Sequence, residues 1–476
     1  MQQDSRATRQ SSTKWALAGL SLTMLMPSLA TSTANVALPS LAKTFAVSFQ
    51  AAQWIVLAYL LTVTALVVVA GRVGDIIGRR PLLLAGTTVF AGGSLLCSLA
   101  PSFELLIVAR VVQGSGAAVM MALTMGLVST VVPAERTGRA MGLLGAMSAV
   151  GTTLGPALGG VLIAWAGGTS IFLVNLPLAA LALGIVFRTL PQDPQRDGDR
   201  SPHIDLAGMS LLAAALIGFT LALTRGRGEF DLASVVILVT AIIAGALFVV
   251  VEARAPSPLI RLDMLRNRGL VAGLATSAIV STVMMSTLIV GPFYLALAVR
   301  LDPASAGLVL AIGPLVAAMV SVPAGRVVDG IGTERAALGG LGSMAAGAAA
   351  LSIVTPASGV AGYLVPIVVM TSGYALFQAA NNTAVMANAS LTERGVVSGM
   401  LNLSRNLGLV TGASAMGAVF AWGTGSADIV SAEPQVLAAG MHATFAAAAL
   451  LVGMSLVMAI RAPRGDPQPS PLENAS

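Results

Sequence analysis

Residues 71–80 read GRVGDIIGRR, and residues 325–332 read GRVVDGIG, with six of the eight aligned positions identical. Each copy follows one long apolar segment and precedes another, so each reads as a charged hinge between two apolar stretches. A motif that returns at the same place in two halves of a chain indicates an internal repeat, and membrane carriers are commonly built from such repeats. The repeat therefore predicts a duplicated membrane carrier rather than an enzyme.

The composition agrees with a membrane location. Of the 476 residues, 56% are hydrophobic and 10% are charged, whereas about 25% of the residues of a soluble protein are charged. The chain holds many apolar runs of about 20 residues, and a helix of that length crosses a hydrocarbon core of about 30 Å. The one cysteine, Cys97, excludes an intramolecular disulfide. We therefore expect an all-α membrane protein.

The apolar runs predict fourteen membrane-spanning helices and both termini on one side. Twenty Lys and Arg residues fall on the predicted inner segments and four on the outer ones. This bias places both termini in the cytoplasm and the chain in the cytoplasmic (inner) membrane. Because the basic residues lie between the spans, they do not indicate nucleic-acid binding. The expected spans are 15–38, 52–71, 82–100, 104–131, 140–165, 170–189, 206–224, 232–251, 269–298, 304–325, 336–355, 361–388, 396–421 and 440–460.

Two linkers divide the predicted spans. Residues 188–205 and 252–268 are rich in proline and charge, and they bracket the seventh and eighth spans. Six spans remain on either side, and the repeated hinge lies between the second and third span of each six. The expected organisation is a tail at 1–14, a six-helix bundle at 15–189, a linker with two extra helices at 190–268, a second bundle at 269–460 and a tail at 461–476.

Three motifs carry a resemblance to a known family. The hinge matches the pattern G-x-x-x-D-x-x-G-R-R, the fourth span holds R-x-x-Q-G, and the fifth holds G-x-x-x-G-P-x-x-G-G. With these motifs in this order, the chain resembles a major facilitator superfamily carrier of the 14-span drug:proton antiporter branch. The residues that carry the motifs are Gly71, Asp75, Gly78, Arg79 and Arg80; Arg110, Gln113 and Gly114; and Gly151, Gly155, Pro156, Gly159 and Gly160.

The resemblance implies roles for these residues. The hinge residues, with Asp329 in the second copy, would form a charge cluster that latches one carrier state. The glycines of the fifth span recur every four residues, so they share one helix face and permit close helix packing, while Pro156 bends the helix. Arg110 would organise the cavity or take part in coupling, together with Gln113. In such carriers the coupling ion is a proton.

Charge within the spans departs from the family pattern. Related exporters usually carry an aspartate in the first span, at the position that is Ala30 here. All 20 acidic residues fall in predicted loops or near span ends, and Glu104 is the deepest candidate for coupling. Arg110 and Arg405 lie within spans, where charges are costly and by default functional. We therefore expect a neutral or anionic organic solute rather than a cation.

The substrate remains open between two classes. One is a drug or metabolite that the chain exports, and the other is a planar nutrient such as riboflavin that it imports. The sequence contains no ATP-binding loop, catalytic constellation or metal site, so we expect no enzyme, cofactor or metal. We also expect a monomer in the lipid bilayer. The expected substrate-binding side chains are polar or aromatic ones in the spans, namely Asn35, Trp54, Tyr59, Tyr294, Tyr374, Gln378, Asn381 and Asn382.

Overall fold

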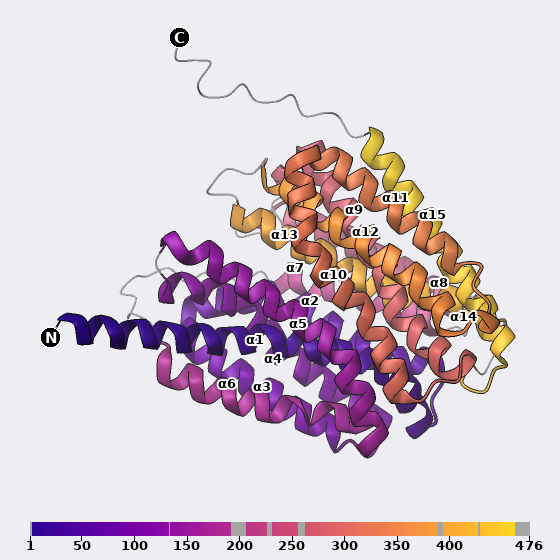
Figure 1. The fold of residues 1–476 in the computed structure, drawn as a ribbon, viewed down its shortest axis with the longest axis horizontal. Coiled ribbons are helices and arrows are strands. Elements are labelled where there is room, and N and C mark those ends of the chain that lie inside the picture. The colour runs from indigo at the N-terminus through magenta and orange to yellow at the C-terminus, as the bar shows by residue number, and fades with distance from the viewer. Residues whose placement is uncertain are drawn as a thin grey trace, which may run out of the picture.

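The computed structural model describes residues 2–132, 134–191, 206–225, 231–255, 262–387, 394–426 and 429–461, and these fold almost entirely into helices. Figure 1 shows the N-terminal helices, in indigo to magenta, packed as one bundle beside the C-terminal helices in orange to yellow. The N-terminal bundle holds α1 (Gln2–Thr44), α2 (Phe49–Ile77), α3 (Arg79–Ser98), α4 (Phe103–Val131), α5 (Ala134–Ala166), the short helix η1 (Gly168–Phe172) and α6 (Asn175–Thr189).

The C-terminal half repeats this plan after a two-helix insertion. The insertion consists of α7 (Leu206–Arg225) and α8 (Leu232–Glu252), which pack against each other. The bundle that follows holds η2 (Leu262–Arg266), α9 (Arg268–Phe293), η3 (Tyr294–Ala298), α10 (Pro303–Ile331), α11 (Thr333–Leu351), η4 (Pro356–Ser358), α12 (Gly359–Ala387), α13 (Arg394–Thr411), η5 (Gly412–Met416), α14 (Gly417–Thr424) and α15 (Pro434–Arg461).

The helices correspond to the predicted spans, with differences at their ends. Thirteen helices in the described residues are long and apolar enough to cross a membrane. The predicted span at 336–355 is α11, which is not among the thirteen because it is rich in Gly and Ala and has Glu334 and Arg335 in its first turn; it packs between α12 and α15. The predicted span at 396–421 is a single path made of α13, the π-helical turn η5 and α14. An all-helical membrane protein is confirmed.

Several predicted helix ends are wrong, and at the end of the first span the reason is that proline did not stop the helix. The first span was expected to end at 38, before Pro39, but α1 continues through Pro27 and Pro39 to Thr44. The last span was expected to begin at 440, but α15 begins at Pro434, and proline is favoured at the first position of a helix. Neighbouring helices in a bundle can satisfy the backbone groups that proline leaves free, so a transmembrane helix tolerates it.

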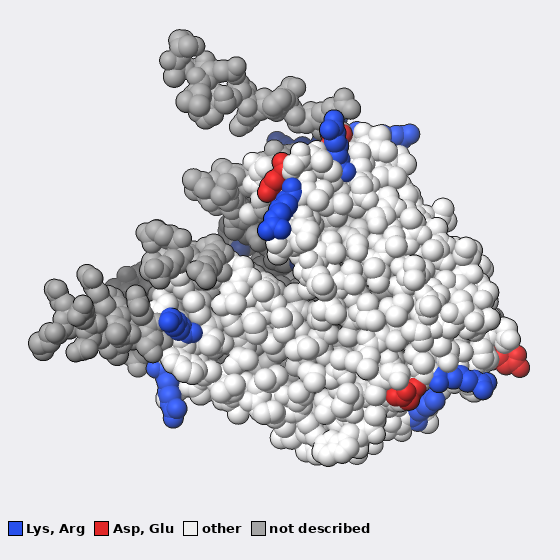
Figure 2. Space-filling view, viewed as in Figure 1, with Lys and Arg blue, Asp and Glu red and all other residues white. Residues whose placement is uncertain are grey.

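The surface shows how the molecule sits in a bilayer. On the face that Figure 2 shows, the visible Lys, Arg, Asp and Glu side chains lie at two opposite edges, with an uncharged band between them. Trp165 and Trp422 lie near the C-terminal ends of α5 and α14 and are 86% and 70% exposed. Both positions fall at the edge that the charge bias assigns to the outside, and exposed Trp is enriched at membrane interfaces.

The two hinges share an unusual backbone conformation at one glycine each. Gly78, between α2 and α3, has φ 99°, and Gly332, between α10 and α11, has φ 85°. Residues other than glycine are strained in this region, so glycine permits the abrupt turn between the two helices. The sequence led us to expect that the second span ends at 71 and that a hinge outside the helices begins at Gly71. That expectation is wrong, because α2 remains helical through Gly71 to Ile77.

Candidate functional site

An aromatic cluster joins the two bundles at the predicted outer ends of their helices. Phe49 at the start of α2 lies edge to face with Phe293 at the end of α9, with ring centroids 4.7 Å apart. Phe49 also contacts Phe420 of α14 at 5.1 Å. All three side chains are buried. We call Phe49, Phe293 and Phe420 the outer aromatic seal.

Further contacts between the two bundles lie on both sides of the outer aromatic seal. Gln53 Nε2 on α2 donates to the carbonyl oxygen of Ala413 in η5, at 2.9 Å. On the other side, α5 and α10 approach so closely that a Cβ at Gly160 would lie 3.0 Å from the Cα of Gly307, and a Cβ at Gly307 would collide with the carbonyl of Pro156. The two glycines therefore permit the helices to touch backbone to backbone.

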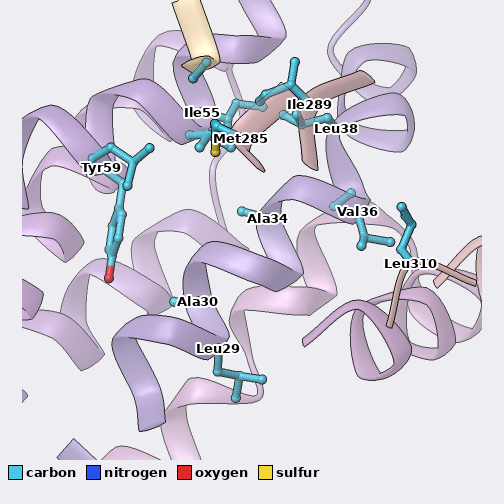
Figure 3. Close-up of a cluster of buried hydrophobic side chains, with 14 of the residues drawn as sticks. Leu29, Ala30, Ala34, Val36, Leu38, Ile55, Tyr59, Met285, Ile289 and Leu310 are labelled. Carbon is cyan, nitrogen blue, oxygen red and sulfur yellow. The ribbon is translucent and has the colours of Figure 1, made fainter. Parts of the chain in front are cut away.

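An apolar layer lies beneath these contacts, toward the middle of the membrane. Figure 3 shows Leu38 of α1 and Ile55 of α2 beside Met285 and Ile289 of α9, so side chains from both bundles share one buried cluster. At the inner side, by contrast, a Cβ added at Gly71 or at Gly325 would meet no atom within 4 Å. The contacts between the bundles named here therefore lie at their outer ends, and no close contact among the described residues involves Gly71 or Gly325.

Two hinge arginines donate to carbonyl groups of their own bundle. Arg79 Nη1 donates to the carbonyl of Gly126 on α4 at 3.1 Å, and Arg80 Nη2 donates to the carbonyl of Phe187 on α6 at 2.6 Å. Asp329 is exposed, with no ion pair among the residues that the structure describes. The side chain of Asp75 lies outside the described part of the chain. A latch between the bundles thus remains a prediction.

Arg110 is enclosed by the N-terminal bundle. Its guanidinium donates from Nε to the carbonyl of Ile55 at 2.7 Å and from Nη1 to Oε1 of Gln113 at 2.5 Å, and it lies 4.3 Å from the ring centre of Tyr59. Gln113 Nε2 donates in turn to Ser94 Oγ at 2.8 Å. The side chain of Arg110 is fully buried. The arginine therefore ties α4 to α2 and, through Gln113, to α3.

The expected coupling partners do not join Arg110. Glu104 is exposed in the first turn of α4, whereas Arg110 is fully buried almost two turns further along that helix. Arg405 lies in the other bundle, on α13, and is half-buried. Ala30, at the position where related exporters carry an aspartate, is fully buried in the shared apolar cluster. Among the described residues, the buried or half-buried positions 30, 110 and 405 therefore carry no carboxylate.

The glycines of the fifth span face α1. A Cβ at Gly151 would lie 2.5 Å from the carbonyl of Leu25, and one at Gly155 would overlap Ser32. A Cβ at Gly159 would lie 3.4 Å from the Cα of Thr33. Ser32 Oγ donates to the carbonyl of Gly151 at 3.1 Å, so a hydroxyl joins the two helices where they approach.

The same seam recurs in the second bundle, and the sequence analysis missed it. On α13 and η5, Gly408 and Gly412 pack against α9, and Thr282 Oγ1 donates to the carbonyl of Gly408 at 3.0 Å. This hydrogen bond repeats the one from Ser32 to Gly151. The spacing of four between Gly408 and Gly412 was the available signal.

Four of the expected substrate-binding side chains lie within packed regions. Trp54 Nε1 donates to Thr224 Oγ1 of α7 at 3.0 Å, and Tyr59 Oη donates to the carbonyl of Pro27 at 3.1 Å. Tyr294 is fully buried, with its ring stacked 6.1 Å from that of Tyr363. Asn35 is buried, and neither of its amide atoms has a partner among the described residues. These four do not converge on one site.

The remaining four lie together on α12. Gln378 Nε2 donates to Tyr374 Oη at 2.9 Å, and Asn381 Nδ2 donates to the carbonyl of Gly273 on α9 at 3.2 Å. Asn382 follows one turn after Gln378, and its Oδ1 is enclosed without a partner in the described part of the chain. The structure therefore gathers its strongest candidate for a binding surface on this helix of the C-terminal bundle.

Comparisons with known proteins agree on a family. The family model described as Major Facilitator Superfamily matches residues 20–413. Multidrug resistance protein Stp of Mycobacterium tuberculosis (strain ATCC 25618 / H37Rv) is 33% identical over 390 residues, which cover 81% of this chain and 72% of Stp. Riboflavin transporter RibZ of Clostridioides difficile (strain 630) is 29% identical over 399 residues, which cover 84% of this chain and 86% of RibZ.

Solved structures share the fold. A bacterial homologue of the human lysosomal transporter Spinster, in an inward-facing and unoccupied conformation, has a TM-score of 0.68 and 16% sequence identity, over 95% of this chain and 97% of that one. A peptide transporter, POT, in complex with sulfate has a TM-score of 0.69 and 16% identity, over 94% and 95% of the chains. At this identity the likeness shows the fold alone.

Proposed function

This chain belongs to the Major Facilitator Superfamily and is a secondary transporter, and we propose that it exports a neutral or anionic organic solute across the cytoplasmic membrane. The proposal concerns the cargo, the direction and the membrane. Its cargo part rests on the distribution of charge along the helices.

The observation that carries the proposal is the position of the carboxylates. A carboxylate inside the membrane attracts lipophilic cations, and cation exporters depend on such a group. Two arginines, Arg110 and Arg405, fall within the predicted spans instead. The presence of two arginines and no carboxylate in the middle of the predicted spans disfavours a cation and favours neutral or anionic cargo. Each acidic residue of the described α-helices lies in a first or last turn, namely Asp4, Asp75, Glu104, Glu135, Glu252, Asp329 and Glu334.

The closed outer ends support a mechanism of alternating access. For cargo to leave, the outer aromatic seal must open while the inner ends of the bundles come together, so that the bundles rock about a central site. Apolar aromatic contacts and glycine-to-glycine packing suit such a joint, because neither requires a charge to be desolvated in either state.

Export is supported by relatives and by the motif on α5. Stp and the drug efflux pump JefA of Mycobacterium tuberculosis, which is 32% identical over 408 residues, carry names that denote resistance or efflux. A second candidate is import of a planar nutrient such as riboflavin. It is supported by the relative RibZ and by alanine at position 30.

Growth experiments separate the two candidates. A drug-sensitive host that expresses the chain should gain resistance to neutral or anionic drugs and none to ethidium, a cation. Ethidium efflux that depends on Arg110 would contradict the proposed cargo. A riboflavin-auxotrophic host tests the alternative: growth on low riboflavin, with accumulation of the labelled vitamin, would establish import and overturn export.

A further inference from the structure

Three polar side chains follow one another along one face of α12. Tyr374, Gln378 and Asn382 are spaced by four residues, so they lie one above the other. The hydrogen bond from Gln378 Nε2 to Tyr374 Oη, at 2.9 Å, fixes the amide of Gln378. Its Oε1 and the Oδ1 of Asn382 are both enclosed, with no partner in the residues that the structure describes. One face of α12 therefore presents two amide carbonyl oxygens, from Gln378 and Asn382, that can accept hydrogen bonds.

This face points away from lipid. Val369 is 38% exposed and lies nine residues before Gln378. At about 100° per residue, nine residues place two side chains on opposite faces of a helix. Thr383, which is exposed, lies opposite Tyr374 by the same spacing. The polar face is thus the inward side of α12.

Hydrogen bonds to α9 place Arg405 of α13 at the same depth in the membrane as Asn382 of α12. Two successive carbonyls of α9 accept from different helices: that of Gly273 from Asn381 Nδ2 of α12 at 3.2 Å, and that of Leu274 from Ser404 Oγ of α13 at 2.5 Å. Asn381 directly precedes Asn382, and Ser404 directly precedes Arg405. The Nε of Arg405 is enclosed and has no partner among the described residues.

The cluster lies on the inner side of the closed outer ends. On α9, the apolar layer contains Met285, eleven residues beyond Leu274 toward the outer end. That separation corresponds to about 16 Å along a helix. A solute that approaches from the inner side would therefore meet this level before it meets the apolar layer.

We propose that Tyr374, Gln378, Asn382 and Arg405 form a substrate subsite for a planar organic anion that carries hydroxyl or N–H groups. The two amide carbonyls accept from the donors of the solute, Arg405 binds its carbonyl or carboxylate oxygen, and the ring of Tyr374 lies against its plane. A solute that lacks these groups leaves the enclosed carbonyls unpaired, which penalises its binding. This inference rests on the proposed function, because it names the cargo of the same carrier.

The test is binding of fluorescein to the purified full-length chain in detergent, at a pH between the pKa values of its carboxyl group and its xanthene hydroxyl, where it is an anion with a flat xanthene ring and one hydroxyl group. Fluorescence anisotropy gives the affinity. Gln378→Met removes the carbonyl at nearly constant size, and Arg405→Gln removes the charge. We expect each to weaken binding tenfold or more, and Arg405→Lys to restore part of the loss. Thr383→Val, on the lipid-facing side of α12, is the matched control and should bind as the wild type does.

Equal affinity in the wild type, Gln378→Met and Arg405→Gln, or no binding by the wild type, would overturn the subsite. Flux in proteoliposomes made from the same preparations separates this result from failure of the proposed function. Transport of fluorescein with unaltered affinity in the variants rejects the subsite and leaves the carrier proposal standing. Absence of organic-anion flux from a folded wild type, with rhodamine 123 transported instead, rejects the proposed cargo.

Discussion

The ring centroids of Phe49 and Phe293 lie 4.7 Å apart, although Phe49 begins the second helix of one bundle and Phe293 ends the first helix of the other. The contact is therefore a joint between two bodies that must separate at this point for the outer side to open. Every side-chain contact described above between the two bundles lies in the outer half of the molecule.

Replacing Phe49 should open the outer ends. Phe49→Ala removes two aromatic pairs, each worth about 1 kcal/mol, so the balance between open and closed outer ends should shift toward open by roughly thirty-fold. Spin labels on Lys43→Cys and Ala357→Cys, both at exposed outer positions, report the distance between the bundles. The native Cys97 is fully buried and need not be replaced.

Phe445→Ala provides the control for this experiment, because Phe445 is fully buried within α15, outside the outer aromatic seal. It should lower thermal stability without a change in the distance distribution. Equal distributions for Phe49→Ala and the wild type would show that the aromatic contact does not hold the outer ends together.

Enlarging Gly307 should prevent the outer ends from closing. In Gly307→Val the new side chain would meet Gly160 and the carbonyl of Pro156 on α5, and overpacking of this kind costs about 1–3 kcal/mol. We expect transport to fall about tenfold or more while the protein still folds. Gly342→Val is the matched control, because a Cβ at Gly342 meets nothing within 4 Å. Similar transport rates in both variants would contradict the close approach.

A lysine at position 110 should not support the stability and transport that Arg110 supports. A lysine ammonium cannot reach the carbonyl of Ile55 and Gln113 Oε1 in the same geometry while it stacks on Tyr59. Arg110→Lys would leave at least one buried polar group unpaired, at a cost of about 1–3 kcal/mol, so thermal unfolding in detergent should occur at a lower temperature. Transport should also be lost. Wild-type stability and flux in Arg110→Lys would contradict a tethering role for the guanidinium.

The inserted helices should stabilise the outer end of α2. Trp54→Phe removes the indole N–H and keeps an aromatic ring, and Thr224→Val removes the hydroxyl acceptor at nearly constant volume. We expect a coupling energy of about 0.5–1.5 kcal/mol between the two changes. A double-mutant cycle of equilibrium unfolding in detergent measures it, and strictly additive effects would show that the hydrogen bond at 3.0 Å contributes nothing.

The fold was accessible from the sequence because its signals are local. Apolar runs and the repeated hinge depend on residues that are close in the chain, so they predicted the helices and the equivalence of the two halves. Even so, the backbone of Gly71 differed from expectation. A glycine in a charged stretch reads as a turn, whereas the helix continues as long as its hydrogen-bond ladder is satisfied, and it breaks at Gly78.

The site was less accessible because it depends on contacts between distant residues. No local pattern shows that Phe49 meets Phe293 and Phe420, or that Trp54 binds α7 rather than a solute. The polar face of α12 was named residue by residue, yet its relation to Arg405 follows from two carbonyls of α9. The spacing of residues within α12 cannot show which residue of α13 lies at the same depth, because that depends on how both helices bind α9.

Uptake by inverted membrane vesicles is the most direct test of the central claim, which is export of non-cationic organic solutes. Fluorescein and rhodamine 123 share a xanthene ring and carry charges of opposite sign, so the pair compares an anion with a cation on one ring system. We expect vesicles that contain the chain to accumulate fluorescein and not rhodamine 123, and we expect Arg405→Gln to abolish this accumulation. Accumulation of rhodamine 123 without fluorescein would contradict the central claim.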